Sequence, residues 1–175
     1  MRGKSVSITA FFRQALRPVG ACRSRAFLSV AMPFMTENRK PKTENRKPAM
    51  IYGIGVDLVK VARIERVLGR YGDRFCARVF TEGEIAYCRG KSWAAAGFAM
   101  RFAAKAAFSK ALGVGLRKGG IRWREVEVIP NRLGKPEIFI TGLAAQLCAE
   151  AGITGTHLSL TDEDGRALAV VILEI

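Results

Sequence analysis

The chain has 175 residues, of which 49% are apolar and 25% charged, and its formal net charge is +14 at pH 7. This length and balance are typical of one globular domain and exclude fibrous and fully disordered proteins. The longest apolar run near the N-terminus, AFLSVAMPFM, is about half the ~20 residues of a membrane-spanning helix, so we expect no transmembrane segment.

The positive charge is concentrated at the N-terminus. Residues 1–49 carry 11 Lys and Arg against two acidic residues, a net charge of +9, whereas residues 50–175 carry +5. The high net charge therefore describes mainly the first segment. A basic nucleic-acid-binding protein stays as a hypothesis that the charge alone suggests.

The N-terminal segment has no core-building pattern. Residues 1–36 are rich in Arg and Ser and lack acidic residues, as organelle transit peptides are, but the next residues repeat TENRKP at 36–41 and 43–48. We expect residues 1–49 to be a basic disordered extension or a misassigned start, with targeting or nonspecific binding as the alternative. The predicted domain is therefore 50–175.

The first predicted elements of the domain are a strand and a basic helix. Residues 51–57 alternate Ile and Val with glycines, which predicts a strand that something approaches closely. Residues 59–71 place apolar side chains at helical spacing, namely Val61, Ile64, Leu68 and Tyr71. A row of arginines lies mostly away from that stripe, namely Arg63, Arg66, Arg70 and Arg74.

Two more helices and several strands follow. Thr81 and Glu84 form a capping-box pattern that opens a helix toward Arg89, and residues 93–112 predict a long helix ended by Gly113 and Gly115. The segments IRWREVEVIP, EIFI, HLSL and ALAVVILEI predict strands, with a helix at 143–151 between the second and third. These elements together predict an α+β domain.

The chain has four cysteines, Cys22, Cys76, Cys88 and Cys148, and their spacing matches no metal-binding pattern. Three of them lie in the predicted domain, which is an odd number for disulfide pairing. We therefore expect a reducing, cytoplasmic location with unpaired thiols.

The stretch RFAAKAAFSKALG contains Arg101, Lys105 and Lys110 but no carboxylate. Cations beside a glycine-rich segment are typical of a phosphate site, because they combine charge with unhindered main-chain N–H groups. The alternative is a solvated helix rim. Position 106 lies one turn before Lys110 on the same side of the helix, whereas Arg101 and Lys105 share another side.

Four motifs occur in order, namely GIGVDL (53–58), RFAAKAAFSKALGVG (101–115), GKP (134–136) and HLSLTDEDG (157–165). Together they resemble the bacterial holo-acyl-carrier-protein synthases, the short class of 4'-phosphopantetheinyl transferases. The resemblance covers residues 50–175 and implies an α+β homotrimer with active sites at subunit interfaces. It further implies Mg²⁺-dependent transfer of phosphopantetheine from coenzyme A to a serine of acyl carrier protein.

The resemblance also implies roles for individual residues. Asp57 matches the metal-binding aspartate, and the implied catalytic set is Asp57, Lys110 and His157. The positions matched to coenzyme A are Arg101, Lys105, Lys110, Gly113, Gly115 and His157. The helix that receives the acidic carrier protein is matched by the arginine row, Arg63, Arg66, Arg70 and Arg74.

Two positions depart from the family pattern. Ala106 stands where the family has its second metal-binding glutamate, and Lys60 stands where a glutamate is usual. Three outcomes stay open: Asp57 with substrate phosphate and water suffices, another carboxylate compensates, or the chain is impaired and only binds coenzyme A or carrier protein. The carboxylates considered for compensation are Glu84, Asp162 and Glu163.

Overall fold

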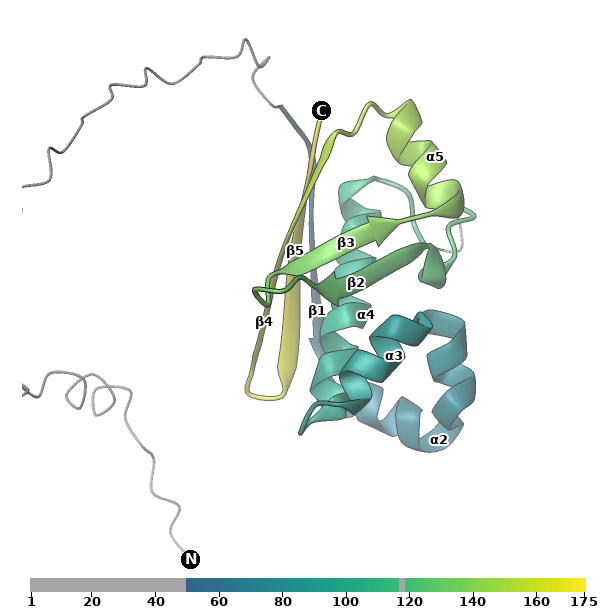
Figure 1. Ribbon diagram of the computed structural model, residues 1–175, viewed down its shortest axis with the longest axis vertical. Helices are drawn as coiled ribbons and strands as arrows, with labels where there is room; N and C mark the ends of the chain where they lie inside the picture. The colour runs from purple at the N-terminus through teal and green to yellow at the C-terminus, as the bar shows by residue number, and fades with distance from the viewer. Residues whose placement is uncertain (1–49, 117–118) are drawn as a thin grey trace, which may run out of the picture. The chain divides into compact units, whose positions relative to one another are not determined.

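The protein is described here by a computed structural model that covers residues 50–116 and 119–175. A three-stranded antiparallel sheet has β5 (Arg166–Glu174) at its centre, flanked by β1 (Ile51–Lys60) and β4 (Gly155–Glu163). The helices lie on one side of this sheet, with α4 (Ala94–Ala111) directly behind it (Figure 1). The other face of the sheet is not covered by any element of the described domain.

The strand β1 packs against α4 at its glycines. A Cβ atom added to Gly55 would lie 1.9 Å from the carbonyl oxygen of Ala107, and one added to Gly53 would lie 2.1 Å from that of Ala111. Any side chain at either position would therefore push the helix away from the strand. The prediction that something approaches this strand closely is confirmed, and the approaching group is the α4 backbone.

The remaining elements complete the domain. They are α2 (Val61–Val79), α3 (Glu82–Arg89), the short helix η1 (Trp123–Glu125), the hairpin of β2 (Val126–Pro130) and β3 (Pro136–Ile140), and α5 (Gly142–Glu150). Three of them, α2, α3 and β2, pack directly against α4. Helix α2 is kinked at Gly72, whose φ of 47° and ψ of −127° are not helical. The core contains the alanine-rich face of α4 together with apolar residues of β2, β5 and α2.

Most predicted elements are confirmed, including the α+β class, the capping box at Thr81 and Glu84, and the long helix. The helix predicted from residue 59 starts instead at Val61, because β1 continues to Lys60, which pairs with Arg166. The strand predicted over IRWREVEVIP is confined to Val126–Pro130. Tyr71, the last residue of the predicted apolar stripe, is 51% exposed and directly precedes the kink at Gly72.

Two predictions concern the N-terminus and the membrane. The basic extension of residues 1–49 lies outside the described residues. Among the helices of the described segments, none has the length and hydropathy needed to cross a membrane.

A buried ion pair connects three of the elements around α4. The Lys105 ammonium on α4 donates to Glu84 Oε2 at 2.7 Å and to the carbonyl oxygens of Trp123 and Val126 at 2.9 and 2.6 Å. Glu84 on α3 also accepts hydrogen bonds from the backbone N–H groups of Thr81 and Val128. Both charged side chains are fully buried, and burial lowers the pKa of Lys105 while the Glu84 carboxylate opposes that shift.

We expect Lys105→Met to destabilise the domain by about 3–5 kcal/mol, because it leaves the Glu84 carboxylate buried without its counter-charge. The double variant Lys105→Met, Glu84→Gln should recover part of that loss, because it removes the unpaired buried charge, although the single amide oxygen can accept only one of the two backbone N–H bonds that Glu84 receives on separate oxygens. Urea unfolding followed by tryptophan fluorescence measures both. Equal losses in the single and double variants would contradict the ion-pair explanation.

Candidate functional site

The first part of the site lies where β1 meets the C-terminal end of α4. Asp57 projects from β1 toward α4, and the Lys110 ammonium donates to Asp57 Oδ1 and to the Val56 carbonyl oxygen, both at 2.8 Å. The Lys110 side chain is 55% exposed and that of Asp57 18% exposed. A carboxylate and a cation are therefore held together at the surface, where an oxyanion or a metal ion can reach both.

Ala106, half-buried one helical turn before Lys110, contributes no ligand to this pair. None of the three carboxylates considered as substitutes lies beside Asp57. Glu84 is bound to Lys105 in the core. Asp162 shares the α4-facing side of the sheet with Asp57, but β5 separates their strands, which places the two backbones at least about 10 Å apart.

Glu163, the third candidate, follows Asp162 on β4, so its side chain points to the opposite side of the sheet. Within residues 50–116 and 119–175, no group of three or more His, Cys, Asp and Glu side chains could hold a metal ion. In the described part of one protomer, none of the three considered carboxylates therefore joins Asp57 at this position.

His157 lies on the other face of the sheet. It is opposite Ile172 and Ile54 in the strand register, on the side away from α4, and its Nε2 is 3.0 Å from Glu174 Oε2. Since alternate strand residues point to opposite faces, Asp57 and His157 project in opposite directions. The structure does not bring these two predicted residues together within one protomer.

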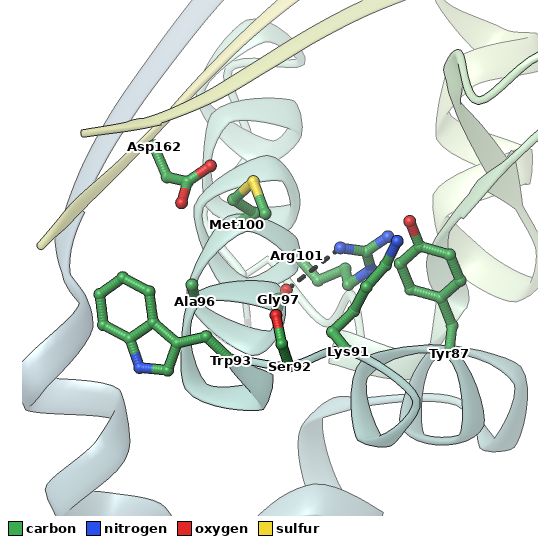
Figure 2. A pocket seen from close by; sticks show the side chains of 9 residues that line it. All are labelled: Tyr87, Lys91, Ser92, Trp93, Ala96, Gly97, Met100, Arg101 and Asp162. Atoms are coloured by element: carbon green, nitrogen blue, oxygen red, sulfur yellow. Dashed lines mark hydrogen bonds between the residues drawn. The ribbon is translucent and has the colours of Figure 1, made fainter.

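The second part of the site is a pocket of about 330 Å³ near the N-terminal half of α4 (Figure 2). Arg101 is 3% exposed and donates from Nη1 to the Gly97 carbonyl oxygen at 3.2 Å, while its buried Nε has no hydrogen-bond partner in the described structure. The remaining lining residues are Tyr87, Lys91, Ser92, Trp93, Ala96, Met100 and Asp162. A buried arginine with an unused donor is chemically suited to an anion.

Lys105 and the two glycines after α4 are placed differently from Arg101. Lys105 is fully buried, and its ammonium already bonds to Glu84 and two carbonyl groups, so it is not available at the surface. Gly113 has a φ of 78°, and its N–H bonds to the Lys110 carbonyl oxygen, which is how helices commonly end. Gly115 is exposed in the following turn and accepts from the N–H of Gly119.

The four predicted partner-binding arginines are all exposed on α2. Three of them form one helical row, namely Arg63, Arg66 and Arg70. Arg74 lies beyond the kink at Gly72 and does not continue that row. In the described part of the chain, none of the four forms a salt bridge, so their charges are available to an acidic surface.

The residues outside α4 that line the Arg101 pocket were not identified from the sequence. The segment YCRGKSW at 87–93 contributes Tyr87, Lys91 and Trp93, and its mixture of aromatic and basic residues was a usable signal. Asp162 was considered only as a metal ligand. Its place in this pocket follows from the pairing of β4 with β5, which a local pattern does not reveal.

Comparisons with known proteins agree with this architecture. A holo-[acyl-carrier-protein] synthase from Geotalea daltonii is 49% identical over 125 residues, covering 71% of this chain and 99% of the relative. The crystal structure of the synthase from Neisseria meningitidis has a TM-score of 0.67 at 38% identity, covering 72% of this chain and all of that one. The Helicobacter pylori synthase, solved in complex with coenzyme A, has a TM-score of 0.61 at 30% identity and covers 69% of this chain and 98% of that one.

The sequence profile of the 4'-phosphopantetheinyl transferase superfamily matches residues 53–171, which include most of β1, all of α4 and both parts of the site. This match covers more than half of the chain, and the similar proteins extend over the same domain. The chain belongs to the 4'-phosphopantetheinyl transferase superfamily.

Proposed function

We propose that the protein transfers the 4'-phosphopantetheine arm of coenzyme A to a serine of apo acyl carrier protein. The observation that supports the proposal is that two positions chemically suited to anions, Lys110 and Arg101, lie along one helix, α4, in a chain similar to holo-[acyl-carrier-protein] synthases. Arg101 precedes Lys110 by nine residues, which corresponds to about 13 Å along the helix axis. Coenzyme A carries phosphate at two places, a pyrophosphate and a 3'-phosphate on its adenosine.

The chemistry decides which end of coenzyme A binds where. The pyrophosphate reacts, so it belongs beside Asp57 and Lys110, where a carrier protein can approach an exposed surface. The adenosine end, with its 3'-phosphate, then occupies the Arg101 pocket. Lys105 is left out of this set because its buried ammonium already bonds to Glu84 and two carbonyl oxygens. Gly113 and Gly115, which follow the end of α4, would border the pyrophosphate position.

In the proposed reaction, the serine hydroxyl oxygen of the carrier protein attacks the β-phosphorus of coenzyme A. The bond from that phosphorus to the bridging oxygen breaks, adenosine 3',5'-bisphosphate leaves with the bridging oxygen, and the hydroxyl proton passes to solvent. The Lys110 ammonium offsets negative charge on the phosphate oxygens as the bond breaks. Asp57 holds Lys110 in place through their 2.8 Å contact.

The residues at Asp57 fit a magnesium ion if the substrate supplies most of its ligands. Mg²⁺ is commonly held by one or two carboxylates together with phosphate oxygens and water. Asp57 presents one such carboxylate, of which Oδ1 is bound to Lys110. Bound there with coenzyme A, Mg²⁺ would neutralise charge on the pyrophosphate.

The carrier protein would meet the surface formed by Arg63, Arg66 and Arg70. These side chains are exposed on α2, whose first residue directly follows β1 and Lys60. Carrier proteins of this class are acidic, so a row of exposed arginines supports encounter and register by complementary charge. Arg74, on the other side of the kink, would act as a peripheral contact.

A homotrimer is also proposed, because one face of the sheet presents apolar side chains to solvent. On β1, Ile54, Val56 and Leu58 are 58, 46 and 57% exposed. Contiguous apolar surface of this kind is typical of subunit interfaces. His157 lies on the same face, so any action of His157 at an Asp57 site requires a second subunit.

The location proposed for the protein is a reducing compartment, the cytoplasm. It is supported by the three cysteines of the described domain, Cys76, Cys88 and Cys148, which are all buried and free. Burial raises the pKa of the Cys88 thiol to about 11, which makes it a poor nucleophile and a structural rather than a reactive group.

The transfer itself is tested by mass spectrometry of apo acyl carrier protein incubated with coenzyme A, Mg²⁺ and the protein. We expect the carrier to gain the mass of one phosphopantetheine group. Asp57→Asn, which keeps the shape but removes the charge, should lower the rate at least about 100-fold. No mass gain with the wild-type chain would contradict the proposed function.

Ala106→Glu tests whether the missing carboxylate limits the site, since residue 106 lies one turn before Lys110. We expect the variant to bind Mg²⁺ about tenfold more tightly in the presence of coenzyme A, measured by calorimetry. Ala106→Gln is the matched control, because it adds the same bulk without the charge. A large rise in turnover as well would show that the natural chain is an impaired transferase, whereas equal behaviour of both variants would exclude a charge effect.

The trimer is tested by placing a charge on the apolar sheet face. Val56→Lys should convert the assembly to monomers in analytical ultracentrifugation and abolish transfer, because the charge would be buried at the interface. Leu133→Lys is the control, since Leu133 is 94% exposed in the turn between β2 and β3, which belong to a separate sheet from β1. A wild-type chain that sediments as a monomer would rule out the proposed assembly.

A further inference from the structure

The Arg101 guanidinium is held by few polar contacts for so buried a group. Within the described residues, Nη1 donates to the Gly97 carbonyl oxygen, and Nε is buried without a hydrogen-bond partner. The guanidinium also contacts an aromatic ring: its central carbon lies 4.2 Å from the centroid of the Tyr87 ring. Figure 2 shows the ring of Tyr87 beside the guanidinium at the edge of the pocket.

A second cation shares the same ring. The Lys91 ammonium lies 4.6 Å from the centroid of Tyr87, and Figure 2 shows it next to the Arg101 guanidinium. Lys91 and Arg101 together lower the pKa of the Tyr87 phenol. Two like charges are thus gathered at one pocket wall, and no salt bridge to either is found among the described residues.

Two neighbouring cations repel each other, so their arrangement needs a group that attracts both. The negative face of an aromatic ring does this without neutralising either charge, and it leaves the N–H donors free. A carboxylate in the same place would occupy those donors. Tyr87 therefore keeps the cations close together and still available to an anion.

We propose that Tyr87 is a positioning residue that holds Arg101 and Lys91 for the 3'-phosphate of coenzyme A. The inference rests on the proposed function and adds two residues to the pocket, Lys91 as a phosphate ligand and Tyr87 as the support of both cations. A phosphomonoester carries close to two negative charges at neutral pH, which matches two adjacent cations. Tyr87 acts on substrate binding through these cations and makes no contact with the reacting pyrophosphate.

The test compares coenzyme A with 3'-dephospho-coenzyme A as ligands of the full chain. Binding is measured by calorimetry for the wild type, Tyr87→Leu and Tyr87→Phe. We expect Tyr87→Leu to weaken binding of coenzyme A about tenfold and to leave binding of the dephosphorylated ligand within about twofold. Tyr87→Phe keeps the ring and should behave like the wild type with both ligands.

Steady-state kinetics give an independent readout. Tyr87→Leu should raise the KM for coenzyme A with little change in kcat, because the reacting end of the substrate is bound elsewhere. Lys91→Met should likewise reduce the preference for coenzyme A over the dephosphorylated ligand. Thermal unfolding of each variant is compared with the wild type, since a purely structural role would lower the Tm and weaken both ligands equally.

The results distinguish failure of the role proposed for Tyr87 from failure of the transferase function. Suppose that the wild type transfers the phosphopantetheine arm but binds the two ligands equally well. The pocket then does not bind the 3'-phosphate, so the role of Tyr87 is overturned while the proposed function stands. The same holds if Tyr87→Leu weakens both ligands equally or neither. A wild type that neither binds coenzyme A nor transfers the arm would overturn the proposed function and this inference together.

Discussion

The close packing of α4 on β1 is the constraint on which the rest of the structure depends. Gly53 and Gly55 let the helix backbone approach so closely that a Cβ at either position would lie about 2 Å from a carbonyl oxygen, at 2.1 and 1.9 Å. This approach brings Lys110 to Asp57 and to the carbonyl of Val56. A wider separation would take the ammonium out of hydrogen-bond distance of both.

The same packing divides the cations of α4 among three environments. Lys110 is at the surface beside Asp57, Lys105 is in the core with Glu84, and Arg101 lines a pocket with an unused donor. Residues of one chemical type thus serve three purposes. The difference comes from what packs against each stretch of the helix: β1 of the sheet at Lys110, Glu84 of α3 with β2 at Lys105, and the end of α3 with residues 87–93 at Arg101.

One protomer leaves the site incomplete in two respects. Within the described residues, none of Glu84, Asp162 and Glu163 lies beside Asp57. His157 points away from Asp57 on the opposite face of the sheet. The apolar face that His157 shares with Ile54, Val56 and Leu58 is exposed in the isolated chain. Further metal ligands at Asp57 would therefore come from the substrate's phosphates, and His157 would act across the proposed subunit interface.

Local sequence patterns were sufficient for several features of this protein. The capping box of α3, the long helix α4, the glycine strand and the α+β class were all predicted, because caps, periodicity and turns are short-range properties. The four ordered motifs likewise led to the superfamily that the profile match shows. Asp57 and Lys110 were named together, and the structure places them in contact.

Only the tertiary structure decided whether each cation and carboxylate is buried, paired or exposed. Arg101 and Lys105 were predicted alike, but contacts with residues distant in sequence bury Lys105 against Glu84 and open a pocket at Arg101. The kink at Gly72 separated Arg74 from its row, and strand pairing put Asp162 and His157 on opposite sides of the sheet. The sequence by itself determined which elements form and which charges they carry, whereas exposure and pairing depend on long-range packing that no local pattern records.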